Sequence, residues 1–401
     1  MPTLLQINVA SNKGSTGKIA ENIGLTAMKE GWKSYIFHGV RYAGKTKLND
    51  ISTNSSLSEF FHYIISLLFD AHGRASFLST RRLIKKIKKI KPDIIHLHNI
   101  HGYYINYNVL FGALQKLNIP VLWTLHDCWS FTGHCVYFDR IGCSKWKSQC
   151  QLCAQSCSYP KSILDFSKRN FLHKKKIFTS INNLTIIPVS FWLSGLVNDS
   201  FLSSYNRYVI HNGIDLSIFK PTESILRSKL GLSNKKVILG VDDGYGVRKG
   251  LDDFIHLSLY LGADFQIILI GVTESDKSKI SNSIIALDRT SNQKELVEYY
   301  SMADVYVNPT YEDNFPTTNI EALACGTPVV TYNTGGSPEA IDSITGIIIN
   351  KGDIRALSNA VIKICGEDRE CFRVKCRSRA ERMFDMNARY NEYIKLYNSL
   401  I

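Results

Sequence analysis

No segment of this 401-residue sequence has the features of an export leader or of a membrane-spanning helix. The chain does not open with a charged segment followed by an apolar core. Its longest apolar run, FFHYIISLLF at residues 60–69, is about half as long as a spanning helix requires. We therefore expect a cytoplasmic protein, whose ten cysteines remain reduced thiols.

Other absences narrow the classes of function. No internal repeat of about 20–50 residues and no low-complexity tract is present. The zinc-protease pattern of two histidines around a glutamate on one helix is missing. No zinc-finger helix or aromatic sheet motif is present either, which argues against a nucleic-acid-binding protein.

Acidic residues are scarce relative to basic ones. The chain has 35 Asp and Glu against 48 Lys and Arg, a net charge of +13, which attracts nucleic acid, anionic lipid or acidic small molecules. In the densest basic run, RRLIKKIKKIKPD at residues 81–93, apolar side chains fall on one side of a helix and lysines on the other. The run is either a solvated helix face or a contact with an anionic membrane surface.

The segment SNKGSTGKIA at residues 11–20 lacks the residues of a Walker nucleotide-binding loop. That loop has a glycine separated by four residues from a Gly-Lys pair, and Ser or Thr directly after the pair. Asn12 and Ile19 occupy these two positions. The amides from Gly14 to Gly17, at the start of a helix, are expected either to face an anion or to form a packing turn.

Short apolar segments alternate with amphipathic helical stretches along the chain. Strands separated by helices of about 10–20 residues indicate parallel sheets, so we predict an α/β fold with two doubly wound, Rossmann-like domains. We expect these at residues 1–205 and 206–378, a linker around 200–222, and a helix at 379–401 that packs back on the first domain. Ligands of such sheets bind beyond the carboxyl ends of the strands, so the cleft between the two domains is the expected site. The expected strands are TLLQINV, KSYIFHG, DIIHLHN, VLWTLHD and LTIIPVS, then KVILGVD, FQIILIG, VYVNPT, PVVTYN and TGIIIN.

The most specific signal is NPTYEDNFPTTNIEALACGTPVVTYNTGGSPEAI at residues 308–341. It resembles the donor-site signature of retaining GT-B glycosyltransferases of the family 4 type, in which an acid and a glutamate are separated by seven residues. Asp313 and Glu321 have this spacing, and GTPV follows at residues 326–329. The family usually has Glu and Gly at the first site, whereas this chain has Asp313 and Asn314, with Glu312 as the alternative first acid.

Three further segments resemble the same family in the same order. VIHNGID at 209–215 is similar to the entry into its second domain, GVRKGLDDF at 246–254 to its Arg-Lys-Gly element, and TLHD at 124–127 to a strand end beside the reacting sugar. The resemblance covers nearly the whole chain and implies a GT-B fold with a central cleft.

The resemblance also implies roles for individual residues. Arg248 and Lys249 are expected to contact the donor diphosphate, where a guanidinium offers a planar fork and an ammonium a compact charge. Glu321, near the start of the helical stretch NIEALACG, is expected to accept the ribose hydroxyls or else to be a helix N-terminal acid. The remaining expected donor contacts are Asp313, Asn314, Phe315, Pro316, Thr317, Thr318, Gly14 and Gly17.

Retention in this family implies a front-face transfer in which the leaving phosphate takes the acceptor proton. His126 is then expected to position the sugar, although a buried, hydrogen-bonded structural histidine is the alternative. His98 and His101 are either acceptor contacts or structural. No Asp-x-Asp element accompanies the donor site, so no catalytic metal is expected.

A cysteine-rich stretch at residues 133–160 follows TLHD. Cys135, Cys143, Cys150 and Cys153 end in a C-x-x-C, a spacing that suits a tetrahedral metal. Because the loop has few large aliphatic residues, we predict a structural zinc ion, with Cys157 as a substitute ligand; free thiols are the alternative. Bacterial surface-polysaccharide members of the family, including those of O-antigen and capsule synthesis, resemble this chain here.

The sequence thus predicts a retaining hexosyltransferase that moves a sugar from a UDP- or GDP-sugar to a glycan or a polyprenyl-diphosphate-linked glycan. A peripheral contact with the inner face of the cytoplasmic membrane is expected, and no nucleic acid. The alternatives are a sugar-nucleotide epimerase, a phosphorolytic GT-B enzyme and, more distantly, a zinc-containing nucleic-acid-binding protein.

Overall fold

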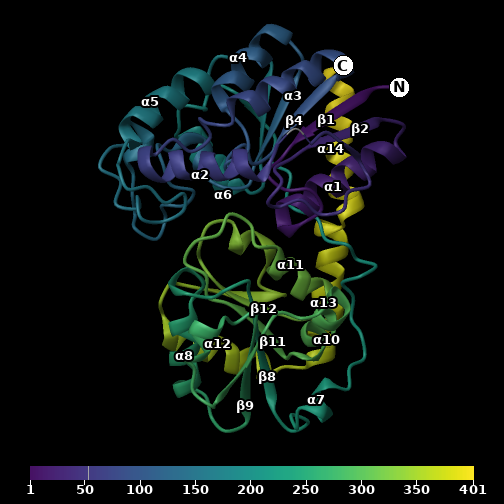
Figure 1. The fold of residues 1–401 in the computed structure, drawn as a ribbon. Coiled ribbons are helices and arrows are strands. Elements are labelled where there is room, and N and C mark those ends of the chain that lie inside the picture. Colours follow the sequence, from purple (N-terminus) through teal and green to yellow (C-terminus); the bar gives the residue numbers. More distant parts are fainter. Residues whose placement is uncertain (53) are drawn as a thin grey trace. The chain divides into compact units, whose positions relative to one another are not determined.

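The computed structural model describes residues 1–52 and 54–401, and these form two compact units. The first unit is Met1–His211 with Arg389–Ile401, and the second is Asn212–Ala388. Each contains one sheet whose strand pairs are all parallel (Figure 1). The predicted fold class, two doubly wound Rossmann-like domains, is confirmed.

The sheet of the first unit has the order β3-β2-β1-β4-β5-β6-β7. The order reverses between β1 and β4, because the chain builds outward from β1 in one direction and then returns to add β4 on its other side. Its strands are β1 (Thr3–Ile7), β2 (Lys33–Phe37), β3 (Asn49–Asp50), β4 (Ile94–Leu97), β5 (Val121–Leu125), β6 (Leu184–Pro188) and β7 (Asn206–Arg207).

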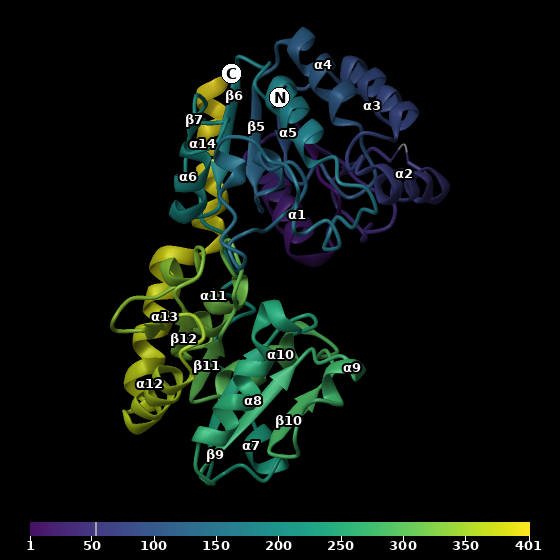
Figure 2. The same ribbon diagram turned by 90° about the vertical axis from the view of Figure 1, so that its left-hand side faces the viewer.

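Helices cover both faces of this sheet, as Figures 1 and 2 show. The C-terminal helix α14 packs on one face, where the Tyr397 hydroxyl lies 2.6 Å from Nδ1 of the fully buried His96. The helices of this unit are α1 (Gly14–Lys29), α2 (Ser56–Phe69), α3 (Phe77–Ile90), α4 (Tyr107–Leu117), α5 (Ser167–Phe178), α6 (Phe191–Asn198) and, from Arg389 on, α14 (Met386–Leu400), with the short turns η1 (Trp129–Phe131) and η2 (Lys145–Lys147).

The sheet of the second unit has the order β10-β9-β8-β11-β12-β13 and reverses between β8 and β11. Alternate residues of its central strands, Ile238, Leu269 and Val307 among them, join α8 and α12 in one apolar core. The strands are β8 (Lys236–Val241), β9 (Phe265–Ile270), β10 (Ile284–Leu287), β11 (Val305–Asn308), β12 (Val329–Tyr332) and β13 (Gly346–Ile349). The helices are α7 (Leu226–Lys229), η3 (Val247–Lys249), α8 (Leu251–Tyr260), α9 (Glu274–Lys277), α10 (Gln293–Met302), α11 (Thr317–Ala324), η4 (Ser337–Ala340), α12 (Ile354–Gly366) and α13 (Arg369–Phe384).

Three strands were not expected from the sequence: β3, β7 and β10. The first and second have two residues each, too few for an alternating pattern to show. β7 lies inside the stretch around 200–222 that was expected to be a linker. Within the described residues, no helix is long and apolar enough to cross a membrane.

Candidate functional site

The second unit carries a buried ion-pair cluster at the carboxyl ends of β8 and β11. The Lys249 ammonium lies 2.9 Å from an Asp242 carboxylate oxygen and 3.0 Å from one of Asp313. Burial alone would lower the pKa of Lys249, but the two carboxylates outweigh it and the pKa is raised. Burial raises the pKa of Asp242, and Lys249 opposes that rise. The cluster lies at the reversal of the strand order, where sheets of this kind bind ligands.

Arg248 forms hydrogen bonds with the loop that carries the predicted first acid. Its Nη1 donates to the Glu312 carbonyl oxygen at 3.0 Å, and the Tyr311 amide donates to the Arg248 carbonyl. The structure therefore brings together Arg248, Lys249 and Asp313, which the sequence assigned to one site. The Glu312 residue is buried, while the carboxylate of Asp313 is the one that meets Lys249.

Two glycines let the backbone pass close behind the two acids. A Cβ on Gly335, which has φ +54°, would lie 1.7 Å from the Asp313 carbonyl oxygen. A Cβ on Gly271, with φ +86°, would lie 1.7 Å from the Asp242 carbonyl oxygen. No side chain fits at either position, so only glycine allows the close backbone approach that shapes the loops carrying the two carboxylates.

The expected phosphate-binding amides lie at the start of α11. Pro316, with φ −68°, is the N-cap residue and provides no side-chain cap, and the first amides of any helix lack partners within it. Thr317 and Thr318 are in this first turn and are partly exposed. Phe315 is buried and its ring contacts Phe384.

Glu321 lies two residues further from the start of its helix than expected. The helix begins at Thr317, so Glu321 is its fifth residue, and the interpretation of an N-terminal helix acid is wrong. The hydroxyl of the fully buried Tyr300 donates to Glu321 Oε2 at 3.0 Å. Burial raises the pKa of Tyr300 far above its usual range, so this hydroxyl keeps its proton and orients the carboxylate. Asn314, just after the first acid, is buried.

In the first unit, His126 belongs to a hydrogen-bonded chain at the carboxyl ends of β5 and β4. Gln6 Nε2 donates to the Ala20 carbonyl, so Gln6 Oε1 accepts from His98 Nε2 at 3.0 Å. His98 Nδ1 must then accept, and His126 Nε2 donates to it at 3.1 Å. Burial lowers the pKa of His126 to about 4. His126 is therefore a neutral, oriented imidazole.

A second pair lies beside this chain. His101 Nε2 is 2.7 Å from Asp127 Oδ2, and the Trp129 amide donates to the other oxygen of Asp127. His98 and His101 are buried, and both have partners within the unit. Asp127 was not singled out from the sequence, although its position at the end of TLHD was a signal. Asp242, at the end of KVILGVD, was missed in the same way.

The glycine loop after β1 begins α1 as expected. Gly14 is the first residue of α1 and has φ +65°. The N-cap residue Lys13 gives no side-chain cap, and the first turn has no acid. A Cβ on Gly17 would lie 3.1 Å from the Cβ of Ala10, so Gly17 also serves packing.

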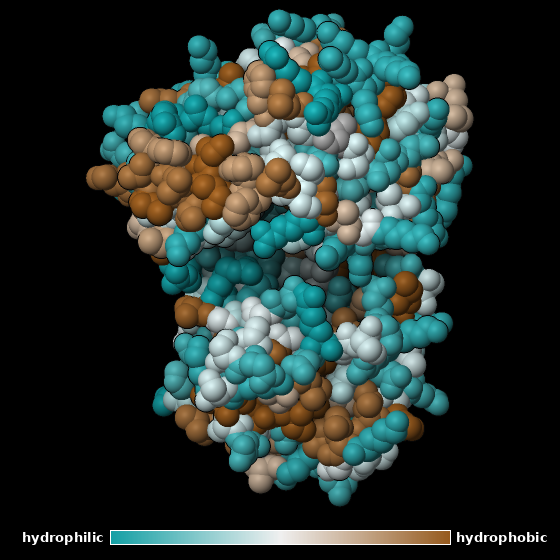
Figure 3. Space-filling view, viewed as in Figure 1, coloured by the Kyte–Doolittle hydropathy of each residue, from teal (hydrophilic) through white to brown (hydrophobic). Residues whose placement is uncertain are grey.

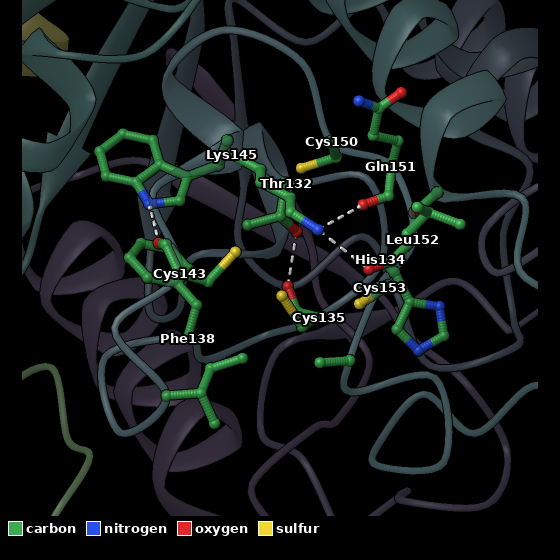
Figure 4. A pocket seen from close by; sticks show the side chains of 14 residues that line it. Thr132, His134, Cys135, Phe138, Cys143, Lys145, Cys150, Gln151, Leu152 and Cys153 are labelled. Carbon is green, nitrogen blue, oxygen red and sulfur yellow. Dashed lines mark hydrogen bonds between the residues drawn. The ribbon is translucent and has the colours of Figure 1, made fainter.

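The four cysteines of the predicted metal site line one cavity of about 220 Å³. Figure 4 shows their sulfur atoms around the Lys145 ammonium, which donates to the carbonyls of Gln151 and Leu152 at 3.0 and 3.1 Å. Across residues 1–52 and 54–401, no group of three or more His, Cys, Asp or Glu side chains is placed to hold a metal ion. The zinc ion therefore stays a prediction.

Aromatic side chains, rather than aliphatic ones, form the interior of the cysteine-rich stretch. The Trp146 ring lies 4.9 Å from the ring of Phe138 and 5.3 Å from that of Phe131. All three residues are buried. The zinc prediction considered only the scarcity of large aliphatic residues in this stretch. These buried aromatic contacts, one of them to Phe131 just before the stretch, are apolar packing that it did not take into account.

Two family models match this chain. The model described as "Glycosyl transferases group 1" matches residues 223–383 of the second unit, and "Glycosyltransferase Family 4" matches residues 51–157 of the first. This chain is a GT-B glycosyltransferase of the group 1 / family 4 type. The segment with Arg248, Asp313 and Glu321 lies inside the first match.

Relatives of this glycosyltransferase span most of its length. The "Putative colanic acid biosynthesis glycosyl transferase WcaC" of Escherichia coli K12 is 23% identical over 88% of this chain and 89% of that protein. Sucrose-phosphate synthase from Thermosynechococcus elongatus has the same fold, with a TM-score of 0.72 at 19% identity, covering 100% of this chain and 99% of that one. Anabaena HepE, solved in complex with UDP, gives 0.69 at 14% identity with 100% of both chains covered.

Proposed function

We propose that this glycosyltransferase moves a hexose from a UDP- or GDP-sugar to a glycan acceptor with retention of anomeric configuration. We place it in bacterial cell-surface polysaccharide synthesis, on the cytoplasmic side of the membrane. The E. coli relative is described as a colanic acid biosynthesis enzyme, and the Anabaena structure was solved with UDP; both support this assignment.

The Arg248–Lys249 pair is the observation on which the proposal rests. Negative charge grows on the departing diphosphate during glycosyl transfer, and preorganised cations act where that charge develops. An ammonium has three N–H donors; those of Lys249 that point to Asp242 and Asp313 hold it in place, which leaves a third for a phosphate oxygen. Arg248, fixed through the Glu312 carbonyl, supplies the planar fork suited to phosphate.

We assign the other residues around this pair. Glu321, oriented by Tyr300, accepts hydrogen bonds from the ribose hydroxyls. The amides of Phe315, Thr317 and Thr318 contact phosphate at the start of α11, where the helix dipole favours an anion. In the first unit, His126 is assigned to the sugar as a neutral hydrogen-bonding group. The acceptor is a glycan carried on a polyprenyl diphosphate.

A donor screen tests the proposal directly. Thermal shift and acceptor-independent hydrolysis are measured with UDP-, GDP-, dTDP- and ADP-sugars. We expect stabilisation by a UDP- or GDP-sugar, and a donor dissociation constant at least about tenfold higher for Glu321→Gln, which removes a charge-assisted hydrogen bond at unchanged shape. Glu367→Gln, at an exposed carboxylate of the same unit, is the matched control and should bind as wild type does.

Three results would overturn the proposal. One is a lack of response to all four nucleotides. Another is isomerisation of the donor without acceptor, which would make the protein an epimerase. Orthophosphate-dependent cleavage of a glycoside would make it a phosphorolytic enzyme. Retention is decided by NMR assignment of the product anomer, and independence from a catalytic metal by an unchanged rate on addition of Mg²⁺ or Mn²⁺.

A further inference from the structure

Helix α2 packs against the rest of the first unit with its polar side. Glu59, His62 and Ser66 are its buried residues. The Glu59 carboxylate accepts from the amides of Val40 and Arg41. His62 Nε2 accepts from the Gly73 amide, and its Nδ1 lies 2.8 Å from Ser76 Oγ. Polar contacts therefore anchor this helix, the reverse of an ordinary surface helix, whose apolar stripe faces the core.

The opposite side of α2 is apolar and exposed. Leu57 is 65% exposed and Phe61 56% exposed. Figure 3 shows the result as a contiguous hydrophobic patch over this helix. We call this surface, with its extension described next, the apolar face; its α2 residues are Leu57, Phe60, Phe61, Ile65, Leu68 and Phe69.

Two neighbouring segments extend the apolar face. The first turn of α3 adds Phe77 and Leu78. The loop after the cysteine-rich stretch is tied to α2, because the Ile163 amide donates to the Leu67 carbonyl at 2.7 Å. Ile163, which is 67% exposed, and Leu164 join the face from this loop. An exposed patch of this extent on one side of a unit marks an interaction site.

Only basic charge borders the apolar face on α2 and α3. The one acid in these two helices is Glu59, which is buried, as is Asp70 at the end of α2. Arg81 stacks on Phe77, its guanidinium carbon 4.2 Å from the ring centroid, and Arg169 Nη2 donates to the Phe69 carbonyl. The exposed bases along α3 and at its end are Arg81, Arg82, Lys85, Lys86, Lys88, Lys89 and Lys91.

We propose that the apolar face is the surface by which the first unit docks on a bilayer that contains anionic lipid. Its side chains enter the boundary between head groups and acyl chains while the bases of α3 pair with lipid phosphates, a combination typical of interfacial helices. A second copy of the chain fits less well, because a self-complementary contact would bring the same basic groups near each other without exposed acids on these helices to pair with. This docking is independent of which nucleotide sugar the enzyme uses.

Vesicle flotation of the full-length protein tests the docking. We expect binding to vesicles of phosphatidylcholine with about a third phosphatidylglycerol, and little binding to phosphatidylcholine alone. Raising the salt from about 0.05 to 0.5 M should lower the bound fraction at least about fivefold, since screening shortens the reach of the bases. We expect Leu57→Gln/Phe61→Gln to lower it at least about tenfold, and Lys85→Gln/Lys86→Gln/Lys88→Gln/Lys89→Gln several-fold.

Matched controls lie in the second unit. Leu259→Gln/Tyr260→Gln removes two exposed apolar side chains, and Lys229→Gln/Lys236→Gln/Lys294→Gln/Lys363→Gln removes four exposed lysines. Both should float as wild type does. Donor hydrolysis and circular dichroism of every variant show that folding and the donor site are intact.

Three outcomes would overturn the proposal. Wild-type protein that does not float, or that floats equally on neutral vesicles, excludes anionic docking. An equal loss of vesicle binding in the second-unit control variants shows that the protein adsorbs non-specifically. A wild-type dimer that Leu57→Gln/Phe61→Gln dissociates, without vesicle binding, assigns the apolar face to a contact between copies. None of these results depends on the donor screen.

Discussion

Lys249 is held by two carboxylates in a site where we expect two further negative charges to arrive with the donor. Lys249→Ala would leave Asp242 and Asp313 facing each other and the diphosphate without their cation. Loss of one preorganised donor costs on the order of 3 kcal/mol in the transition state, so we predict a fall in kcat of about 100-fold. Steady-state kinetics with the donor identified by the screen measures it.

The control for this variant is Lys236→Ala, at an exposed lysine of the same unit. It should keep wild-type kinetics. A Lys249→Ala enzyme with unchanged kcat and normal folding would remove Lys249 from the diphosphate site.

His126 gives a prediction about pH. Because burial lowers its pKa to about 4, the imidazole is already neutral at pH 6 and does not titrate between about pH 5.5 and 8. The profile of log kcat against pH should therefore have the same shape in wild type and in His126→Gln, with a lower plateau in the variant. A limb near pH 6–7 that disappears in His126→Gln would show instead that His126 acts as a general base.

At the scale of an element, the metal content of the protein distinguishes the two interpretations of the cysteine-rich stretch, a zinc site and free thiols. We predict about one zinc per chain by elemental analysis, because the C-x-x-C spacing suits a tetrahedral metal and the four predicted ligands line one cavity. The described positions of these thiols do not form a metal site, so zinc binding has to draw them together. Removal by a chelator should lower the melting temperature of the first unit, since binding of a structural metal is coupled to folding. Cys143→Ser and Cys150→Ser should each reduce the zinc content strongly.

Two exposed cysteines complete that experiment, Cys371 as the control and Cys157 as a test of the ligand set. Cys371→Ser, in the second unit, should retain zinc fully. Cys157→Ser decides whether Cys157 replaces one of the four predicted ligands. The zinc prediction would be contradicted by protein that contains no metal after purification under reducing conditions and in which all ten thiols react once the chain is unfolded.

The first unit as a whole should lose stability in acid. Burial lowers the pKa of His62 and of His96 to about 3, against about 6.5 in the unfolded chain. As the pH falls below about 6.5 the unfolded state takes up these protons first, so stability is lost between there and about pH 3. Each histidine contributes about 2 kcal/mol of this loss between pH 7 and 5.

Denaturant titrations at pH 7, 6 and 5 measure the effect in the unfolding transition of the first unit. His62→Gln and His96→Gln should each make the dependence on pH shallower, whereas His256→Gln, at an exposed histidine of the second unit, should leave it unchanged. A pH dependence that is the same in all four proteins would show that other groups cause the acid sensitivity.

The sequence by itself determined the two sheets and most of their strands. Apolar segments such as KVILGVD and FQIILIG, separated by helical stretches, admit little besides parallel strands with crossover helices. The resemblance of its motifs to family 4 glycosyltransferases also placed Arg248, Lys249 and Asp313 at one site, and the structure brings these three residues together. The two-residue strands β3 and β7 could not be predicted from the sequence, since pairing along a sheet edge depends on the neighbouring strand and not on local periodicity.

Tertiary structure alone decided which partners surround each side chain. Asp313 meets Lys249 because β8 and β11 are neighbours in the sheet, although the two residues are 64 positions apart in the chain. His126 is neutral because the fold buries it behind His98 and Gln6. The apolar side of α2 could be read from the sequence as one half of an amphipathic helix; that it faces outward follows from hydrogen bonds to Glu59 and His62, which exist only once the chain has folded.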